Sequence, residues 1–129
     1  MNVAIFGLGY IGLPTAALVA SSGTNVVGID NNTNIINNIS KGDIINFEAN
    51  LKESVLKVLD NGNLKVTDQP TSAEIYVVTV PTPIDNKNCP DLSYVKEVTK
   101  TIAPMLIKGN MIILESTLPV GGTEKMIEW

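Results

Sequence analysis

The sequence predicts a doubly wound α/β domain, in which helices cover both faces of a parallel sheet with strand order 3-2-1-4-5. Short apolar runs alternate with stretches of helical period along all 129 residues, the pattern of strand–helix–strand units with right-handed crossovers. A glycine-rich turn, Gly7-Leu-Gly-Tyr-Ile-Gly12, joins the first run to the first helix. Small or polar residues follow the apolar runs, at the edge where such sheets bind ligands.

The first strand is predicted over 3–6, where Val-Ala-Ile-Phe forms a continuous apolar run of the kind buried on both faces of a sheet. The helix after it begins at the glycine turn and continues through Ala20. Pro14 is compatible with this helix, because N–H groups in a first turn have no intrahelical partner to lose. Gly23 suits the left-handed residue that follows a helix end.

A second strand is predicted over 25–29, and Asp30 follows at its end. Two amphipathic helices come next, each with apolar residues on one face: Ile35, Ile36 and Ile39 in the first, which Gly42 ends, and Phe47, Leu51, Val55 and Leu59 in the second. The third strand, over 64–67, has a weak signal, whereas 75–80 has the strongest in the chain. Pro81 and Pro83 end that strand, because proline cannot donate to a sheet ladder.

The next helix is predicted to begin at Asp91, a residue type that caps helices, and to end or bend at Pro104. Its inward residues are expected to be Val95, Val98 and Ile102. A fifth strand is predicted over 111–114, and 121–129 indicates the start of another helix. Residues 1–129 are expected to form one domain, because this length is too short for two.

Composition excludes several classes of protein and site. The chain has no apolar run long enough to cross a bilayer and no basic start followed by a cleavage site, so a cytoplasmic protein without a membrane partner is expected. A formal charge of −4 and scattered lysines argue against a nucleic-acid partner. The chain has no histidine, and its single cysteine, Cys89, excludes an internal disulfide and a cysteine-based zinc site. No metal site is predicted.

Each glycine of the first turn has a distinct physical role. Gly7 lets the chain turn sharply off the strand, and Gly9 lets the backbone approach a pyrophosphate without a Cβ in the way. Gly12 lets the helix pack closely on the strand. The helix that begins there directs its N–H groups and the positive end of its dipole toward the phosphates. Because the turn lies between an apolar strand and an alanine-rich helix, it predicts a bound dinucleotide.

Asp30 narrows the choice of dinucleotide. It follows the second strand, where an acid accepts hydrogen bonds from the adenosine ribose and repels a 2′-phosphate. Asn31 and Asn32 come next, without a basic residue that would receive such a phosphate. This favours NAD over NADP as the cofactor. The alternative is that Asp30 only caps the following helix.

The other predicted strand ends carry Asp68, Thr82 and Ser116-Thr117, which are expected to converge with Gly7 and Asp30. The turns at Thr82 and at Ser116-Thr117 either bind a cofactor through their hydroxyl groups or merely end the strands before them. Three further residues have open interpretations: Glu115 is a catalytic carboxylate or, preferably, orients the next turn; Tyr10 contacts the cofactor through its backbone or packs outside the turn; and Cys89 is interpreted as a lone loop cysteine.

Three segments, in order and at matching strand ends, resemble the UDP-glucose/GDP-mannose dehydrogenase family: Gly7-Leu-Gly-Tyr-Ile-Gly-Leu-Pro-Thr-Ala16, Val80-Pro-Thr-Pro-Ile84 and Glu115-Ser-Thr-Leu-Pro-Val-Gly121. The resemblance covers essentially the whole chain. It implies a Rossmann-like NAD-binding domain of an enzyme that oxidises the C6 alcohol of a nucleotide sugar to a carboxylate with two NAD⁺. By position it implies NAD contacts at Tyr10, Ile11, Asp30, Thr82, Thr117 and Thr123, beside the glycines of the turn. The basic residue that some relatives carry shortly after the acid is absent from 31–38.

Within the family, three segments are most similar to the branch whose substrate is UDP-N-acetyl-D-mannosamine, with UDP-glucose as the alternative. They are Pro90-Asp91 with Tyr94-Val95, Ile102-Ala103-Pro104, and Thr123-Glu-Lys-Met126. The resemblance places the nucleophilic cysteine, the catalytic lysine and aspartate, and most of the sugar pocket in a carboxyl-terminal domain. No catalytic residue is therefore expected in this chain, which we interpret as a fragment lacking the final strand or strands of its sheet.

Two other hypotheses stay open at this point. The chain could be a stand-alone dinucleotide-binding module without catalysis. It could also belong to another dehydrogenase of the same fold, such as a 2-hydroxyacid type, which Thr82 and Ser116-Thr117 disfavour. An edge strand over 111–114 would leave backbone groups unpaired, which predicts self-association through that edge or through the helix that ends at Trp129. The parent enzyme is expected to be a homo-oligomer.

Overall fold

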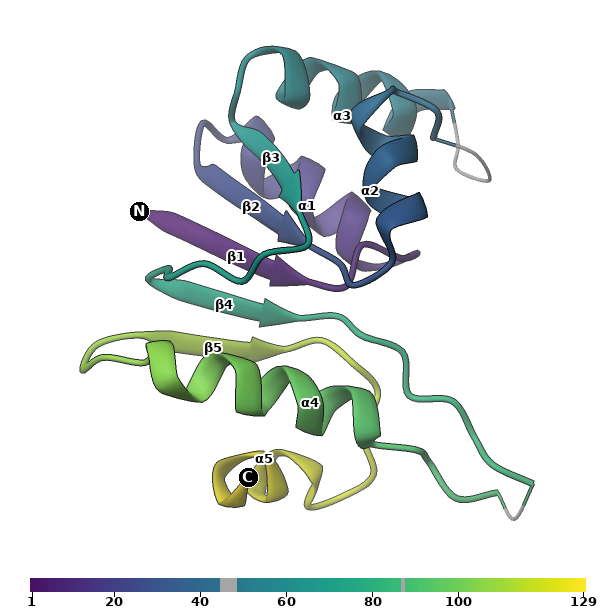
Figure 1. Cartoon of the computed structure of the whole chain (residues 1–129), viewed down its shortest axis with the longest axis vertical. Coiled ribbons are helices and arrows are strands. Elements are labelled where there is room, and N and C mark those ends of the chain that lie inside the picture. The colour runs from purple at the N-terminus through teal and green to yellow at the C-terminus, as the bar shows by residue number, and fades with distance from the viewer. Residues whose placement is uncertain (45–48, 87) are drawn as a thin grey trace.

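The five strands of the sheet all run parallel, in the predicted order β3-β2-β1-β4-β5 (Figure 1). The computed structural model describes residues 1–44, 49–86 and 88–129. The strands are β1 (Asn2–Phe6), β2 (Asn25–Ile29), β3 (Leu64–Thr67), β4 (Ile75–Val78) and β5 (Met111–Leu114). The helices are α1 (Gly12–Ser21), α2 (Thr33–Ser40), α3 (Ala49–Asp60), α4 (Ser93–Ile102) and α5 (Gly122–Glu128), with a 3-10 turn over Ala103–Met105.

Alternating side chains of β1 enter two separate cores. Val3 and Ile5 pack with residues of α1, α2 and α3 on one face of the sheet. Ala4 and Phe6 pack on the other face, in a core that includes Ile102 of α4 and Met126 of α5. Because both faces of the central strand are covered, its residues 3–6 are apolar without interruption. This confirms the predicted doubly wound class.

The predicted elements differ from the observed ones mainly at their ends. The strand predicted over 75–80 ends at Val78, because the neighbouring β1 ends at Phe6 and Gly7 turns away with φ +95°. The N–H of Thr79 donates to the carbonyl of Phe6 at 2.9 Å as the pairing with β1 ends. In α3, Val58 is buried beside the predicted Val55. Phe47, also predicted for that helix, lies outside the described residues.

Helix α4 begins close to the predicted cap. Asp91 Oδ1 accepts the N–H of Ser93 at 2.9 Å, although Leu92 stands in the cap position itself. Hydrogen bonds from the Ser93 hydroxyl and then from its N–H hold the pKa of the Asp91 carboxyl below its usual value. Val95 and Ile102 are fully buried as predicted. The helix ends before Pro104, which lies in the 3-10 turn.

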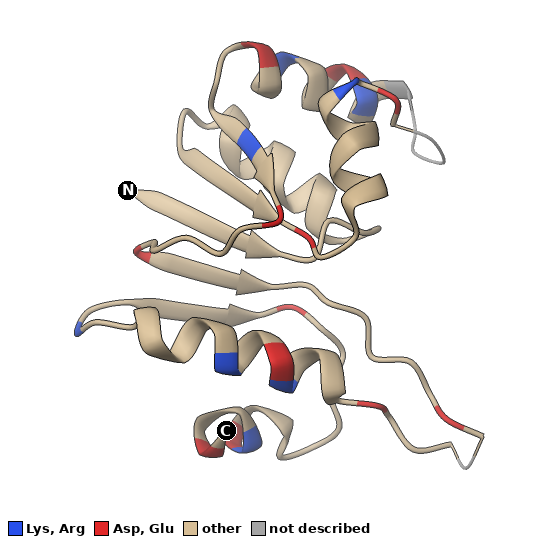
Figure 2. Ribbon diagram, viewed as in Figure 1, with Lys and Arg blue, Asp and Glu red and all other residues tan. Residues whose placement is uncertain are grey.

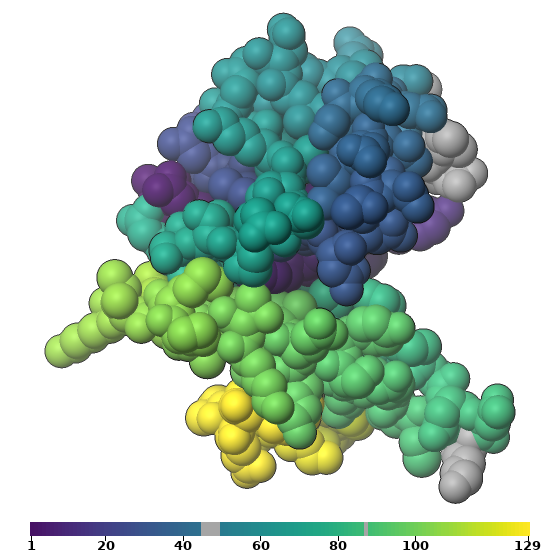
Figure 3. All heavy atoms as spheres, viewed as in Figure 1, coloured from purple at the N-terminus to yellow at the C-terminus, as the bar shows by residue number. Residues whose placement is uncertain are grey.

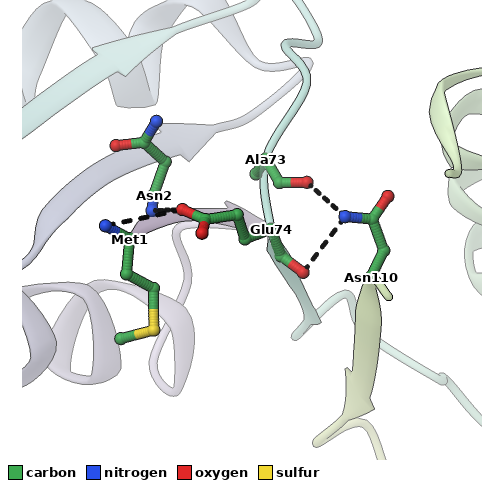
Figure 4. Close-up of polar contacts among 5 residues, drawn as sticks. All are labelled: Met1, Asn2, Ala73, Glu74 and Asn110. Atoms are coloured by element: carbon green, nitrogen blue, oxygen red, sulfur yellow. Dashed lines mark hydrogen bonds and ion pairs between the residues drawn. The ribbon is translucent and has the colours of Figure 1, made fainter. Parts of the chain in front are cut away.

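The amino ends of β1, β4 and β5 are joined by a small polar cluster (Figure 4). Glu74 Oε2 accepts the N–H of Asn2 at 2.6 Å and lies 3.5 Å from the terminal amine of Met1. Asn110 Nδ2 donates to the carbonyl of Ala73 at 3.1 Å. The Asn2 hydrogen bond, followed by the charge of the terminal amine, lowers the pKa of Glu74. Its stabilising contribution is present above the ordinary glutamate pKa and is lost as the pH falls through the lowered value.

Strand β5 forms one edge of the sheet and pairs with β4 alone among the described strands. Its side chains are unusually exposed for an apolar strand: Met111 is 56%, Ile112 37% and Ile113 40% exposed. On the segment that follows, Val120 and Ile127 are also exposed. The predicted edge strand is therefore present, with apolar side chains and backbone groups open to a partner.

Candidate dinucleotide site

A cleft of about 800 Å³ lies at the carboxyl ends of the strands. Helix α2, which contributes Ile35 to the lining, and helix α4 lie on opposite sides of this edge (Figure 3). The predicted site residues that line it are Gly7, Gly9, Tyr10 and Ile11 of the glycine turn, Asp30 after β2, Thr82 after β4 and Thr117 after β5. Asp68, Glu115 and Ser116 line it as well. Segments far apart in the sequence thus meet in one cleft, as the strand-end argument predicts.

The glycine turn has the geometry that its sequence predicts. Gly7 adopts φ +95°, which favours glycine. A Cβ on Gly9 would meet no heavy atom within 4 Å, so the backbone there faces open space. A Cβ on Gly12 would overlap the carbonyl oxygen of Gly7, at 1.7 Å. Gly12 therefore packs directly on the turn and lies beneath the cleft lining. Tyr10 and Ile11 are largely exposed at the cleft.

Thr79 is a residue of this site that the sequence interpretation missed. It is buried, and its Oγ1 lies 2.7 Å from the carbonyl oxygen of Gly7 and 2.9 Å from that of Phe6. The hydroxyl thus satisfies carbonyl groups exposed where the chain turns off β1. A single polar residue within the apolar run 75–80 was the available signal.

The Asp30 carboxylate contacts the protein through both oxygens. Oδ2 accepts the N–H of Leu8 in the glycine turn, and Oδ1 accepts the N–H of Asn32, each at 2.8 Å. The capping residue of α2 is Asn32, whose side chain accepts the N–H of Asn34. The alternative that Asp30 merely caps this helix is therefore wrong. Asp30 instead stands between the turn and the open cleft.

The two predicted threonines lie side by side. Thr82 Oγ1 and Thr117 Oγ1 are 3.0 Å apart, so the loops after β4 and β5 share a hydrogen bond inside the cleft. Ser116 Oγ strengthens the same junction by donating to the carbonyl of Val80 at 2.7 Å. Glu115 accepts a hydrogen bond from Thr15 Oγ1 at 3.2 Å, which connects the β5 loop to the first turn of α1.

Two residues lie elsewhere. Thr123 is an exposed residue of α5 and does not line the cleft. Cys89 lies in the loop before α4, where its N–H donates to Asp85 Oδ1 at 2.8 Å, and it too is absent from the cleft lining. Within the described residues no three potential metal ligands gather, and no helix is long and apolar enough to cross a membrane.

The cleft has an acidic lining. Among the described residues its charged lining residues are Asp30, Asp68, Glu97 and Glu115, with no lysine. Figure 2 shows acidic residues near the strand ends and lysines on α3, α4, α5 and β3. A diphosphate bound here would rely on backbone N–H groups and the α1 dipole. Helix α4 adds Tyr94, Glu97, Val98 and Thr101, which sequence reasoning did not assign to the site.

An open parallel sheet that places a glycine turn and an acidic strand end in one cleft defines the class of dinucleotide-binding domains. Within that class, the chain belongs to the UDP-glucose/GDP-mannose dehydrogenase family: residues 1–129 match the NAD binding domain of that family. NAD is accordingly its cofactor.

Individual relatives agree with this assignment. The chain is 48% identical over 129 residues to a UDP-N-acetyl-D-mannosamine dehydrogenase from Campylobacter jejuni, covering 99% of this chain and 32% of the relative. It is 43% identical over 128 residues to the Escherichia coli K12 enzyme of the same name, covering 99% and 30%. A solved UDP-D-ManNAc dehydrogenase from Pyrococcus horikoshii superposes with a TM-score of 0.93 at 40% identity, covering 99% and 31%. The chain thus spans about a third of the length of these relatives.

Proposed function

We propose that this chain is the cofactor domain of a nucleotide-sugar 6-dehydrogenase whose substrate is UDP-N-acetyl-D-mannosamine. The observation that carries the proposal is the convergence of the glycine turn, Asp30 and the Thr82–Thr117 pair in one cleft. The names of the relatives support the choice of sugar. Oxidising a primary alcohol to a carboxylate removes two hydrides and consumes one water, so two NAD⁺ are reduced for each product.

We assign each part of the NAD molecule to the residues whose chemistry suits it. We assign the pyrophosphate to the backbone of Gly7–Gly12 and the amino end of α1, and the adenosine ribose to Asp30. Thr82 and Thr117 supply neutral hydroxyls that can donate or accept toward the ligand. Thr123 stays a prediction from resemblance, because it lies outside the cleft lining.

We further propose that residues 1–129 hold the oxidant without turning over the sugar by themselves. The chain covers about a third of the length of the related enzymes, and among the described residues the cleft lining has no cysteine or lysine that could form a covalent intermediate with the substrate. The substrate-attacking groups are then supplied by the rest of the longer protein. We also propose that the longer protein acts in polysaccharide biosynthesis, and its predicted place there is the cytoplasm.

The preference for NAD⁺ over NADP⁺ tests the proposed cofactor site. The acidic cleft should accept NAD⁺ and bind NADP⁺ at least about tenfold more weakly, because a 2′-phosphate would meet the Asp30 carboxylate. Calorimetric titration of both nucleotides measures the ratio. Asp30→Ala should weaken the binding of NAD⁺ and bring the affinities for NAD⁺ and NADP⁺ closer together. Asp68→Ala, which removes an equal charge after β3, should change the ratio of the two affinities less. Equal affinity of the unmodified chain for both nucleotides would contradict the proposal.

That the parent enzyme is a homo-oligomer stays a prediction, separate from the behaviour of the exposed edge strand β5 in residues 1–129. We expect residues 1–129 to self-associate through β5, because Met111 and Ile113 expose apolar surface beside unpaired backbone groups. The molar mass measured by light scattering should rise with protein concentration. Ile113→Lys, which places a charge on the edge, should keep the chain monomeric over the same range. A chain that is strictly monomeric at high concentration would exclude association through this edge.

A further inference from the structure

The glycine turn is fastened to the end of β2 around Leu8. The Gly7 N–H donates to the carbonyl of Ile29 at 2.8 Å, and the Leu8 N–H donates to Asp30 Oδ2 at the same distance. The Leu8 side chain is only 2% exposed and lies against Gly28, where an added Cβ would come within 2.7 Å of Leu8 Cδ2. The turn and the strand end are therefore packed as one unit.

The Asp30 carboxylate is a charged acceptor for the N–H of Leu8, which lies in the middle of this turn. A hydrogen bond from a backbone N–H to a carboxylate is roughly twice as strong as a neutral one. The two oxygens of a carboxylate offer about four lone-pair positions, so the bonds from Leu8 and Asn32 leave acceptor capacity for a ligand. Gly9, the residue after Leu8, lines the open cleft, and an added Cβ there would meet no heavy atom within 4 Å.

We propose that Asp30 is a positioning residue for the phosphate-binding backbone in addition to accepting the ribose. Its bond to the Leu8 N–H holds Gly9 in place before a ligand arrives, so the carboxylate affects phosphates that it does not touch. The consequence for ligand affinity rests on the proposed NAD site. Simple electrostatics predicts the opposite sign, because removing a negative charge beside a phosphate should strengthen binding.

The opposite signs make the test decisive. The probe is inorganic pyrophosphate, which has no ribose, titrated into the ¹⁵N-labelled chain and followed by NMR. The matched variants are Asp30→Ala and Asp68→Ala, since both acids line the cleft and Asp68 bonds to the Gln69 side chain rather than to the turn. Hydrogen exchange of the Leu8 amide, measured without ligand, reports on the turn itself.

Asp30→Ala should raise the Leu8 exchange rate at least about tenfold and raise the Kd for pyrophosphate about fivefold. Asp68→Ala should leave the exchange rate unchanged and the Kd unchanged or lower. Asp30→Asn keeps an oxygen that can accept the Leu8 N–H, so it should retain much of the protection of the Leu8 amide from hydrogen exchange. This variant also keeps the test valid if the alanine variant unfolds. Equal behaviour of the Asp30 and Asp68 variants would overturn the proposal. A chain that binds no NAD⁺ would refute the proposed function, while the ligand-free exchange rate would still decide whether Asp30 positions the turn.

Discussion

Gly9→Ala is expected to weaken NAD⁺ binding at least about tenfold, or about 1.4 kcal/mol, while leaving the fold intact. Its Cβ would meet no protein atom within 4 Å, so the folded chain accepts it without overlap. The same Cβ would occupy the space through which we expect the pyrophosphate to approach the backbone. Replacing glycine where the backbone is compatible is neutral or slightly stabilising, because the unfolded chain loses freedom.

Calorimetry with NAD⁺ and thermal unfolding of the same samples separate the two effects. The free energy of unfolding should stay within about 0.5 kcal/mol of the unmodified chain. Gly9→Val should weaken binding further, because a larger side chain fills more of the same space. An alanine variant that binds NAD⁺ as tightly as the unmodified chain would show that the phosphates do not pass over Gly9.

Gly12→Ala is expected to have the opposite profile, with its main effect on stability. The new Cβ would lie 1.7 Å from the carbonyl oxygen of Gly7 and 2.5 Å from Thr79 Oγ1. The Gly7 carbonyl cannot move freely, because the N–H of the same residue is bonded to Ile29 of β2. We expect a loss of about 3 kcal/mol, the upper part of the usual range for overpacking.

Urea unfolding with and without Thr79→Ala locates the source of this loss. Removing the Thr79 hydroxyl relieves the side-chain overlap and leaves the backbone overlap at Gly7, so the double variant should recover little stability. Full recovery would place the strain at Thr79 instead. An unchanged midpoint for Gly12→Ala alone would mean that the helix does not pack on the turn as described.

The fold could be predicted because its signals are local and periodic. Val3 and Ile5 face one core, while Ala4 and Phe6 face the other, and a continuous apolar run records this double burial. The sequence predicts that β4 ends at Val80, two residues beyond its observed end at Val78, because the apolar run continues to Val80 while the pairing depends on where β1 stops. Strand pairing is a property of two segments, so one segment's composition does not set its length.

The site was predictable where topology brings strand ends together and less so where side-chain direction decides. Asp30, Thr82 and Thr117 follow strands of one sheet, so parallel pairing brings them together in the cleft. Which residues of α4 line the cleft depends on how closely that helix approaches the sheet edge, and the sequence of α4 does not determine this approach. Thr123 came from resemblance alone and lies on an exposed part of α5.

An NMR titration tests most directly whether NAD⁺ lies in the cleft at the carboxyl ends of the strands. We expect the largest amide shifts over 7–12 and at Asp30, Thr82 and Thr117. A second hollow of about 720 Å³, beside Lys41 and Lys57 between α2 and α3, provides the internal control and should show little change. Shifts concentrated in that hollow, or no shifts with NAD⁺ in large excess, would contradict the assignment of the cleft.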